Sequence, residues 1–124
     1  MIKFFSLSSG SNGNCYYIGN ENTAFLIDSG IGPRTVKKRL QEHGIDINSI
    51  EFVLVTHDHI DHIKGVGVLS EKYSLPVYAT SLLHKSLDNH PCTRCRLCGS
   101  VRKCEPHTAT RYKDVEFTPF VVPH

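Results

Sequence analysis

The segment from Leu54 to His62, LVTHDHIDH, constrains this chain more than any other part of its sequence. It completes an apolar, β-branched run, EFVLVT, and places three histidines and two aspartates within six consecutive residues. A run of this kind predicts a strand buried on both faces, so the polar side chains would stand at its carboxyl end. Charged groups and imidazoles would be costly at a buried strand end without a metal ion to bind them. The segment therefore predicts a metal site.

The spacing H-x-H-x-D-H suits more than one metal ion. Zinc prefers imidazole nitrogen and carboxylate oxygen, and a catalytic site leaves one position open for water. His57 and His59 are alternate residues, so an extended segment can point both at one ion, while Asp61 and His62 approach a second ion. Two ions about 3.5–4 Å apart share a hydroxide and clamp the attacking and leaving oxygens of a hydrolysed ester.

Strand-like and helix-like segments alternate along most of the chain. The predicted strands are residues 2–7, 15–19, 24–28, 51–56 and 76–80, the predicted helical segments are 32–44, 64–74 and 81–89, and a hairpin is predicted over 111–122 with its turn near Lys113 and Asp114. In the first helix, Val36 and Leu40 share one face, Pro33 stands at the entry and Gly44 at the end. This alternation indicates an α/β layered fold with its chemistry at the strand ends.

Length and composition limit the domain organisation and the location. A chain of 124 residues with 40% hydrophobic and 21% charged residues fits one soluble globular domain. No apolar run approaches the roughly 18 residues of a membrane helix, and the N-terminal run is too short for a signal peptide. We therefore expect a cytoplasmic protein without a membrane partner.

The motif T-H-x-H-x-D-H after a hydrophobic strand resembles the signature of the metallo-β-lactamase superfamily. Flanking stretches are similar to its YycJ/WalJ/VicX branch: SLSSGSNGNCYYI, FLIDSGI, GIDINSIEFVLVTHDHIDHIKGVGVL, YSLPVYAT and VEFTPFVVPH. The resemblance covers most of the chain apart from about residues 88–110. It implies an αββα sandwich of which residues 1–124 form the N-terminal part. Members of this branch are regarded as DNA-acting metallo-hydrolases, related in fold to ribonucleases J and Z.

The same resemblance implies roles for individual residues. The implied ligands are His57, His59 and His124 for the first metal ion, and Asp61 and His62 for the second ion, where both would take part in catalysis. Asp28, in LIDSG, would orient a metal-bound histidine through a hydrogen bond. Asp58 stands where the motif is variable and receives no ligand role.

One difference from the family concerns the residues that follow the VPH element. In the family a bridging aspartate and a final histidine come later, and this sequence holds none after His124. The first ion then has three predicted protein ligands and the second only two. We expect the second ion to bind weakly, unless a missing C-terminal half or another chain completes its ligands.

A cysteine-rich segment, residues 90–107, interrupts the resemblance. It arranges Cys92, Cys95, Cys98 and Cys104 as C-x2-C-x2-C-x5-C between His90 and His107. This spacing favours a small structural zinc knuckle inserted within the domain. Two alternatives stay open. The bacterial iron–sulfur run C-x2-C-x2-C-x3-C-P matches the first three cysteines only, and neighbouring arginines would activate free, redox-sensitive thiols.

Charge and motif together favour one function over two alternatives. Residues 85–113 carry seven Lys or Arg against two acidic residues, although the net charge is only +2. Such a segment either contacts nucleic-acid phosphates or forms a solvated positive surface. The favoured function is a zinc- or manganese-dependent phosphodiesterase acting on DNA or RNA through a metal-bound hydroxide. The alternatives are a hydrolase of small esters or thioesters, and an incomplete or inactive metal- or nucleic-acid-binding fragment.

Overall fold

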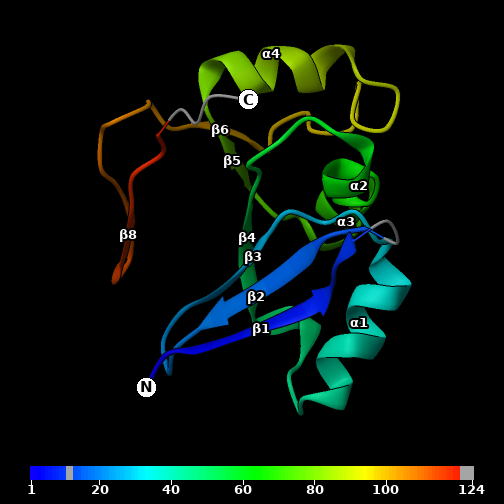
Figure 1. Cartoon of the computed structure of the whole chain (residues 1–124), viewed down its shortest axis with the longest axis vertical. Helices are drawn as coiled ribbons and strands as arrows, with labels where there is room; N and C mark the ends of the chain where they lie inside the picture. The colour runs from blue at the N-terminus through cyan, green and yellow to red at the C-terminus, as the bar shows by residue number, and fades with distance from the viewer. Residues whose placement is uncertain (11–12, 121–124) are drawn as a thin grey trace.

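A computed structural model describes residues 1–10 and 13–120 of the chain (Figure 1). Its elements are, in chain order, β1 (Lys3–Ser8), β2 (Cys15–Gly19), β3 (Ala24–Ile27), α1 (Pro33–Glu42), the 3-10 helix η2 (Ile47–Ser49), β4 (Ile50–Leu54), α2 (Ile60–Ile63), α3 (Val66–Tyr73), β5 (Val77–Ala79), α4 (Ser81–Asn89), β6 (Val101–Lys103), β7 (Thr110–Tyr112) and β8 (Val115–Phe117). Within these described residues, no helix is both long and apolar enough to cross a membrane.

Six strands form one mixed sheet in the order β1-β2-β3-β4-β5-β6. Strands β1 to β3 pair antiparallel, whereas β3, β4, β5 and β6 pair parallel. Parallel neighbours need crossover connections, and helices α1, α3 and α4 supply them. The carboxyl ends of the four parallel strands consequently meet at one edge of the sheet, where chemistry is predicted.

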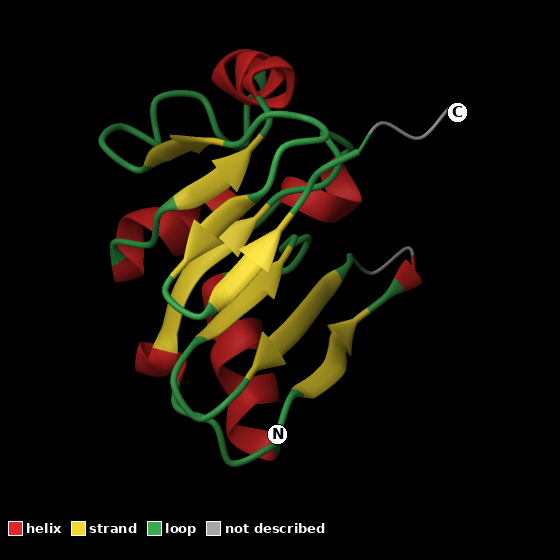
Figure 2. Cartoon of the chain, turned by 90° about the vertical axis from the view of Figure 1, so that its left-hand side faces the viewer, coloured by secondary structure: helices red, strands yellow, loops and turns green. Residues whose placement is uncertain are grey.

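Helices α1 and α3 cover one face of this sheet, behind the strands in Figure 2. The facing side chains of three strands, Leu26, Val53 and Val77, are in register and buried. From α1, Val36 and Leu40 are fully buried, as their spacing predicts. The burial of these apolar side chains fixes the strands and, with them, the position of their carboxyl ends.

Aromatic side chains dominate the opposite face, which the hairpin β7–β8 partly covers (Figure 2). Phe52 lies at the centre, with its ring centroid 4.5 Å from Phe25 and 4.7 Å from Tyr112. The Tyr78 and Phe117 rings meet edge to face at 5.5 Å. These contacts dock the hairpin against the middle of the sheet.

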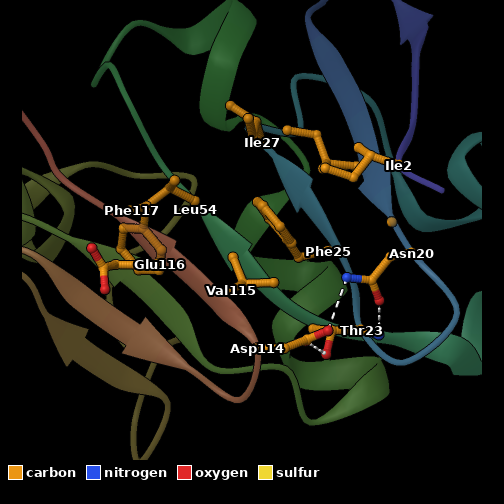
Figure 3. Close-up of a pocket in the computed structure, with 12 residues that line it drawn as sticks. Ile2, Asn20, Thr23, Phe25, Ile27, Leu54, Asp114, Val115, Glu116 and Phe117 are labelled. Carbon is orange, nitrogen blue, oxygen red and sulfur yellow. Dashed lines mark hydrogen bonds between the residues drawn. The ribbon is translucent and has the colours of Figure 1, made fainter.

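The hairpin turn is attached to the β2–β3 turn by hydrogen bonds (Figure 3). Thr23 Oγ1 donates to Asp114 Oδ1 at 2.6 Å, and Asn20 Nδ2 donates to Asp114 Oδ2 at 3.0 Å. Beside this attachment a cavity of about 430 Å³ remains, lined mainly by apolar side chains of β2, β3 and the hairpin. The hairpin therefore leaves part of this sheet face uncovered.

Most predicted elements are confirmed, including the hairpin turn at Lys113 and Asp114. Three elements were not predicted: the 3-10 helix η2, the single-turn helix α2 and strand β6. Strand β6, Val101–Lys103, is short and exposed, so it lacks the apolar pattern by which buried strands are predicted. Helix α2 lies inside the histidine motif, where polar residues give no helical periodicity.

Candidate metal centre

The histidine motif follows β4 at the carboxyl edge of the sheet, beside Asp28 at the end of β3. The two strand ends are tied together because the Asp28 N–H donates to the Leu54 carbonyl at 2.8 Å. Residues 55–58 connect β4 to His59, whose backbone is extended and which precedes helix α2. The first turn of α2 then brings His62 back, since its N–H donates to the His59 carbonyl at 2.9 Å. Strand pairing and one helical turn thus gather the motif around Asp28.

Three side chains form the candidate metal group: Asp28, His57 and His62. One ligand atom from each lies within 4.8 Å of the others. The centroids of the two imidazole rings are 4.5 Å apart. Asp28 is buried and both histidines are half-buried, so the group sits in a recess at the sheet edge. The two imidazoles are donors that suit zinc, and the carboxylate lies beside them.

Asp28 is fully engaged in hydrogen bonds. Its Oδ1 accepts the Thr56 N–H at 2.7 Å, and its Oδ2 accepts the Thr56 hydroxyl at 2.5 Å. The same Oδ2 lies 2.8 Å from Nδ1 of His62. Asp28 adopts a left-handed φ of 59°, a conformation uncommon for residues other than glycine. The contact between Asp28 Oδ2 and His62 Nδ1 is the one that the predicted orienting role of Asp28 would use. It turns Nε2 of His62 away from the carboxylate.

Thr56 and Asn14 also reach the centre, and the sequence reasoning did not assign either a role there. The Thr56 hydroxyl lies 2.8 Å from His57 Nδ1, so it contacts both Asp28 and a histidine. Asn14 Nδ2 lies 3.4 Å from His62 Nε2 and 3.4 Å from Asp61 Oδ2. Thr56 stands directly before the first motif histidine, and this position in the sequence could have indicated its role at the centre. Asn14 lies in SSGSNGN, a stretch whose composition favours a turn over a role in the site.

Close backbone packing holds the loops of the centre together. The Asn14 N–H donates to the Asp61 carbonyl at 2.6 Å, and the Gly30 N–H donates to the Asn14 carbonyl at 2.8 Å. A Cβ on Gly30 would lie 1.9 Å from the Asp61 carbonyl oxygen. Only glycine permits this approach, so the close packing of three segments distant in sequence depends on this one residue.

The other predicted ligands lie outside the group formed by Asp28, His57 and His62. His59 is exposed, and its ring centroid is 5.9 Å from that of His57. Asp61 is half-buried beside Asn14. Neither contributes a ligand atom to the group of three, and His124 lies outside the described residues. The predicted division into His57 with His59, and Asp61 with His62, stays a prediction.

A second cavity, of about 450 Å³, opens beside His57. It lies between the ends of the parallel strands, helix α4 and the segment after β8. Its walls are largely apolar, with the lining residues Leu54, Val55, Thr56, His57, Thr80, Leu82, Leu83, Cys104, Phe117, Thr118, Pro119 and Phe120. A ligand held by the metal group would therefore have an apolar surface next to it.

The cysteine-rich segment does not form a comparable group. Cys95 and Cys98 are exposed, Cys92 is half-buried and Cys104 is buried. Over residues 1–10 and 13–120, the only group of three or more donor atoms within 4.8 Å is the one at Asp28. Structural zinc on the four predicted cysteines therefore stays a prediction.

Comparisons with known proteins give the family and the fold of the chain. Residues 9–114 match the family model described as "Metallo-beta-lactamase superfamily". The chain is 39% identical to the exodeoxyribonuclease YycJ of Bacillus anthracis over 71% of its own length, and 29% identical to the exodeoxyribonuclease WalJ of Streptococcus pneumoniae over 99%. The solved structure of the metallo-beta-lactamase MIM-2 superposes on 98% of the chain with a TM-score of 0.75, and at 17% identity this likeness concerns the fold.

The chain spans less than half of each of these proteins. It covers 33% of the YycJ relative, 46% of the WalJ relative and 49% of the MIM-2 chain. The matched portion of each is what one half of such a fold would provide.

Proposed function

This chain belongs to the metallo-β-lactamase superfamily and is similar to YycJ and WalJ, and we propose that it provides the histidine-motif half of a metal-dependent nuclease. The proposed reaction is hydrolysis of phosphodiester bonds in DNA, with RNA as the second candidate substrate. The observation that carries the proposal is the group formed by Asp28, His57 and His62 at the carboxyl edge of the sheet. The two relatives with exodeoxyribonuclease names support DNA as the substrate.

The donor atoms fit a divalent metal ion. The proposed ligands are His57, His59 and His124 for one ion, and Asp61 and His62 for the other. Imidazole and carboxylate donors suit Zn²⁺, and Mn²⁺ is the alternative. When bound, such ions generate a nucleophile from water at neutral pH and neutralise the charge that develops on the phosphodiester.

The surrounding residues hold the imidazoles in position before any ligand arrives. Asp28 accepts a hydrogen bond from the Nδ1–H of His62, so Nε2 is left with its lone pair for the metal. Thr56 links the same carboxylate to the His57 ring. Asp61 is the proposed group that holds the second ion and positions the nucleophile. This arrangement lowers the cost of ordering the ligands when a metal ion binds.

We also propose that residues outside these 124 complete the active centre. The second ion has two proposed ligands here, and the sheet face beside the hairpin retains a cavity of about 430 Å³. The shares covered, 33% of the YycJ relative and 46% of the WalJ relative, support completion by a C-terminal half or by another chain.

The test is a nuclease assay on protein expressed from its complete reading frame, so that any residues beyond His124 are included. End-labelled single-stranded DNA, duplex DNA and RNA of the same sequence are incubated with Zn²⁺ or Mn²⁺. We expect DNA cleavage that EDTA abolishes, and product lengths from each label distinguish exonuclease from endonuclease action. His57→Ala should remove the activity, whereas Asp58→Asn, exposed in the same motif and without a proposed ligand role, should retain it.

Hydrolysis of small esters or thioesters is the competing function, favoured by the apolar cavity beside His57. A thioester and a β-lactam are therefore assayed in parallel with the nucleic acids. Turnover of the thioester that depends on His57, without cleavage of DNA or RNA, would replace the proposed function with this one. Absence of turnover on every substrate, with metal bound, would favour the inactive binding fragment.

A further inference from the structure

The structure separates Cys104 from the other three cysteines of the cysteine-rich segment. Cys104 follows β6, where its N–H donates to the Ala79 carbonyl at 3.0 Å. Its side chain is 2% exposed and lines the cavity beside His57 together with Leu83 and Phe117. Burial raises the pKa of the Cys104 thiol above its usual value. Cys104 is thus a packed, neutral thiol at the sheet edge and is poorly suited to bind a metal ion elsewhere.

The backbone of residues 90–100 is anchored against helices α3 and α4. The buried Thr93 hydroxyl donates to the Leu87 carbonyl of α4 at 2.6 Å, and Leu97 is 4% exposed. Arg96 pairs with Glu71 of α3 at 2.6 Å. A Cβ on Gly67 of α3 would lie 2.6 Å from the Cys92 carbonyl oxygen, so helix and segment are in close contact. The segment is therefore a fixed scaffold and not a loose loop.

Successive turns present the cysteines on this scaffold. Cys92, Cys95 and Cys98 are three residues apart, and backbone hydrogen bonds between residues three apart recur along the segment, from Thr93 to His90, Arg96 to Thr93 and Ser100 to Leu97. These turns keep the three cysteines within one short folded segment. Left-handed backbone at Cys95, φ 65°, and at Gly99, φ 80°, bends the segment back on itself.

His90 extends the same group. The Cys92 N–H donates to His90 Nδ1 at 3.2 Å, so this nitrogen is unprotonated beside the first cysteine, and it must release this hydrogen bond before it binds a metal ion. His107, by contrast, follows β6, and its N–H donates to the Pro119 carbonyl at 2.6 Å. The two histidines that flank the cysteine-rich segment consequently lie with different parts of the fold.

We propose that His90, Cys92, Cys95 and Cys98 form a structural Zn²⁺ site, separate from the centre at Asp28, and that Cys104 is not a ligand. Three thiolates and one imidazole are an established donor set for structural zinc. The three thiolates leave the site with a net charge of about −1, which the neighbouring Arg94 offsets. The four side chains must rotate toward one another before they can bind one zinc ion. The exposed side chains of Cys95 and Cys98 have room to do so. Each thiol releases its proton to solvent when it binds.

The test measures zinc per chain in a His57→Ala/His59→Ala/His62→Ala background, which removes ligands of both ions proposed at the other centre. Protein is expressed with added Zn²⁺, dialysed and measured by mass spectrometry of the metal. We expect one zinc ion per chain in this background, and loss of that ion on Cys95→Ser, Cys98→Ser or His90→Gln. Cys104→Ser and Cys15→Ser are matched controls at buried cysteines and should retain it. Replacement of zinc by Co²⁺ should give thiolate charge-transfer absorption in the same variants that bind zinc.

Three results would overturn the proposal. Loss of zinc in Cys104→Ser, with circular dichroism unchanged, would show that the four-cysteine set is correct. Zinc absent from the background protein, with a visible iron–sulfur chromophore after anaerobic reconstitution with iron and sulfide, would show a cluster instead. A disulfide between Cys95 and Cys98, found under conditions where zinc is available, would show a redox pair. Because the background lacks His57, His59 and His62, none of these results depends on the proposed nuclease activity.

Discussion

The centre at Asp28 and the cysteine-rich segment hold their metal-binding side chains in opposite ways. At the centre, His62 is fixed by a 2.8 Å contact with the buried Asp28, which also accepts two hydrogen bonds from Thr56. In the cysteine-rich segment the backbone is anchored, but the thiols of Cys95 and Cys98 point to solvent. The first region has ordered side chains before a metal ion binds, and the second has only an ordered backbone.

The difference follows from where each region sits. The centre lies between strand ends and backbone loops, where a buried polar group must find a hydrogen-bond partner. The cysteine-rich segment lies on the surface, where water satisfies polar groups and side-chain rotation is retained. Metal binding should therefore order the side chains of the cysteine-rich segment and leave those of the centre largely unchanged.

The largest effect is expected from a substitution at Gly30, which tests whether close backbone packing keeps the centre ordered. In Gly30→Ala the new Cβ would meet the Asp61 carbonyl oxygen at 1.9 Å and the Asn14 nitrogen at 2.8 Å. Both are backbone atoms, so the loops must separate, at a cost of about 1–3 kcal/mol or more in the free energy of unfolding. We expect loss of metal binding at the centre and unchanged zinc at the cysteines. Urea unfolding and metal analysis measure the two effects.

Gly32→Ala is the matched control for this substitution. Nothing lies within 4 Å of a Cβ at Gly32, whose φ of −76° suits any residue. It precedes helix α1, so alanine there should cost about 0.5–1 kcal/mol through weaker capping, with metal binding retained. Equal losses in the two variants would show that backbone packing at Gly30 does not hold the centre.

The second prediction concerns the orienting role of Asp28. In Asp28→Asn an amide nitrogen replaces one oxygen, so one of the three donors from Thr56 and His62 loses its acceptor. Partners of this kind typically contribute 10–100-fold in metal affinity or activity, and we expect a loss in that range at the centre. Competition with a fluorescent chelator measures the affinity. Asp46→Asn, at the exposed cap of the 3-10 helix η2, is the control. Affinity within twofold of the parent would argue against the orienting role.

The sequence was sufficient to predict the fold class, an amphipathic helix over 32–44, which the structure forms over Pro33–Glu42, and the hairpin turn, because each has a local signal. Val36 and Leu40 recur at helical spacing, and apolar strands alternate with helices. It did not predict the role of Asn14, because its contact with Asp61 joins residues 47 positions apart. Nor did it divide the cysteines, since the fourth cysteine is separated from the others only by the exposed strand β6.

The third prediction compares the reactivity of buried and exposed thiols. Burial raises the pKa of Cys15 to about 12, so at pH 8 only ~10⁻⁴ of it is the reactive thiolate. The raised pKa and the burial of Cys104 likewise lower the reactivity of its thiol. We expect iodoacetamide to modify Cys95 and Cys98 at least tenfold faster than these two in metal-free protein. Peptide mass spectrometry measures the rates. Added zinc should protect the exposed pair and leave Cys104 unchanged; uniform rates would contradict the structural division.

The smallest effect is expected at Asp114, in the hairpin that follows the cysteine-rich segment. The hydrogen bond from the Thr23 hydroxyl, with a second from Asn20, holds the pKa of the Asp114 carboxyl below its ordinary value of 3.8. A carboxyl whose pKa is lowered by folding stabilises the folded chain above its unfolded pKa, and this contribution is lost as pH falls through the folded pKa. Wild type should therefore unfold at slightly higher urea than Asp114→Asn at pH 6, and the difference should shrink as pH is lowered below 3.8. Thr23→Val, which removes the main donor, should show the same convergence.

Because Asp114 contacts neither region, metal content should not change in either variant. A difference that persists unchanged at low pH would mean that the hairpin is held by its aromatic contacts and not by this carboxylate, and a change in metal content would mean that the two regions are coupled through the hairpin.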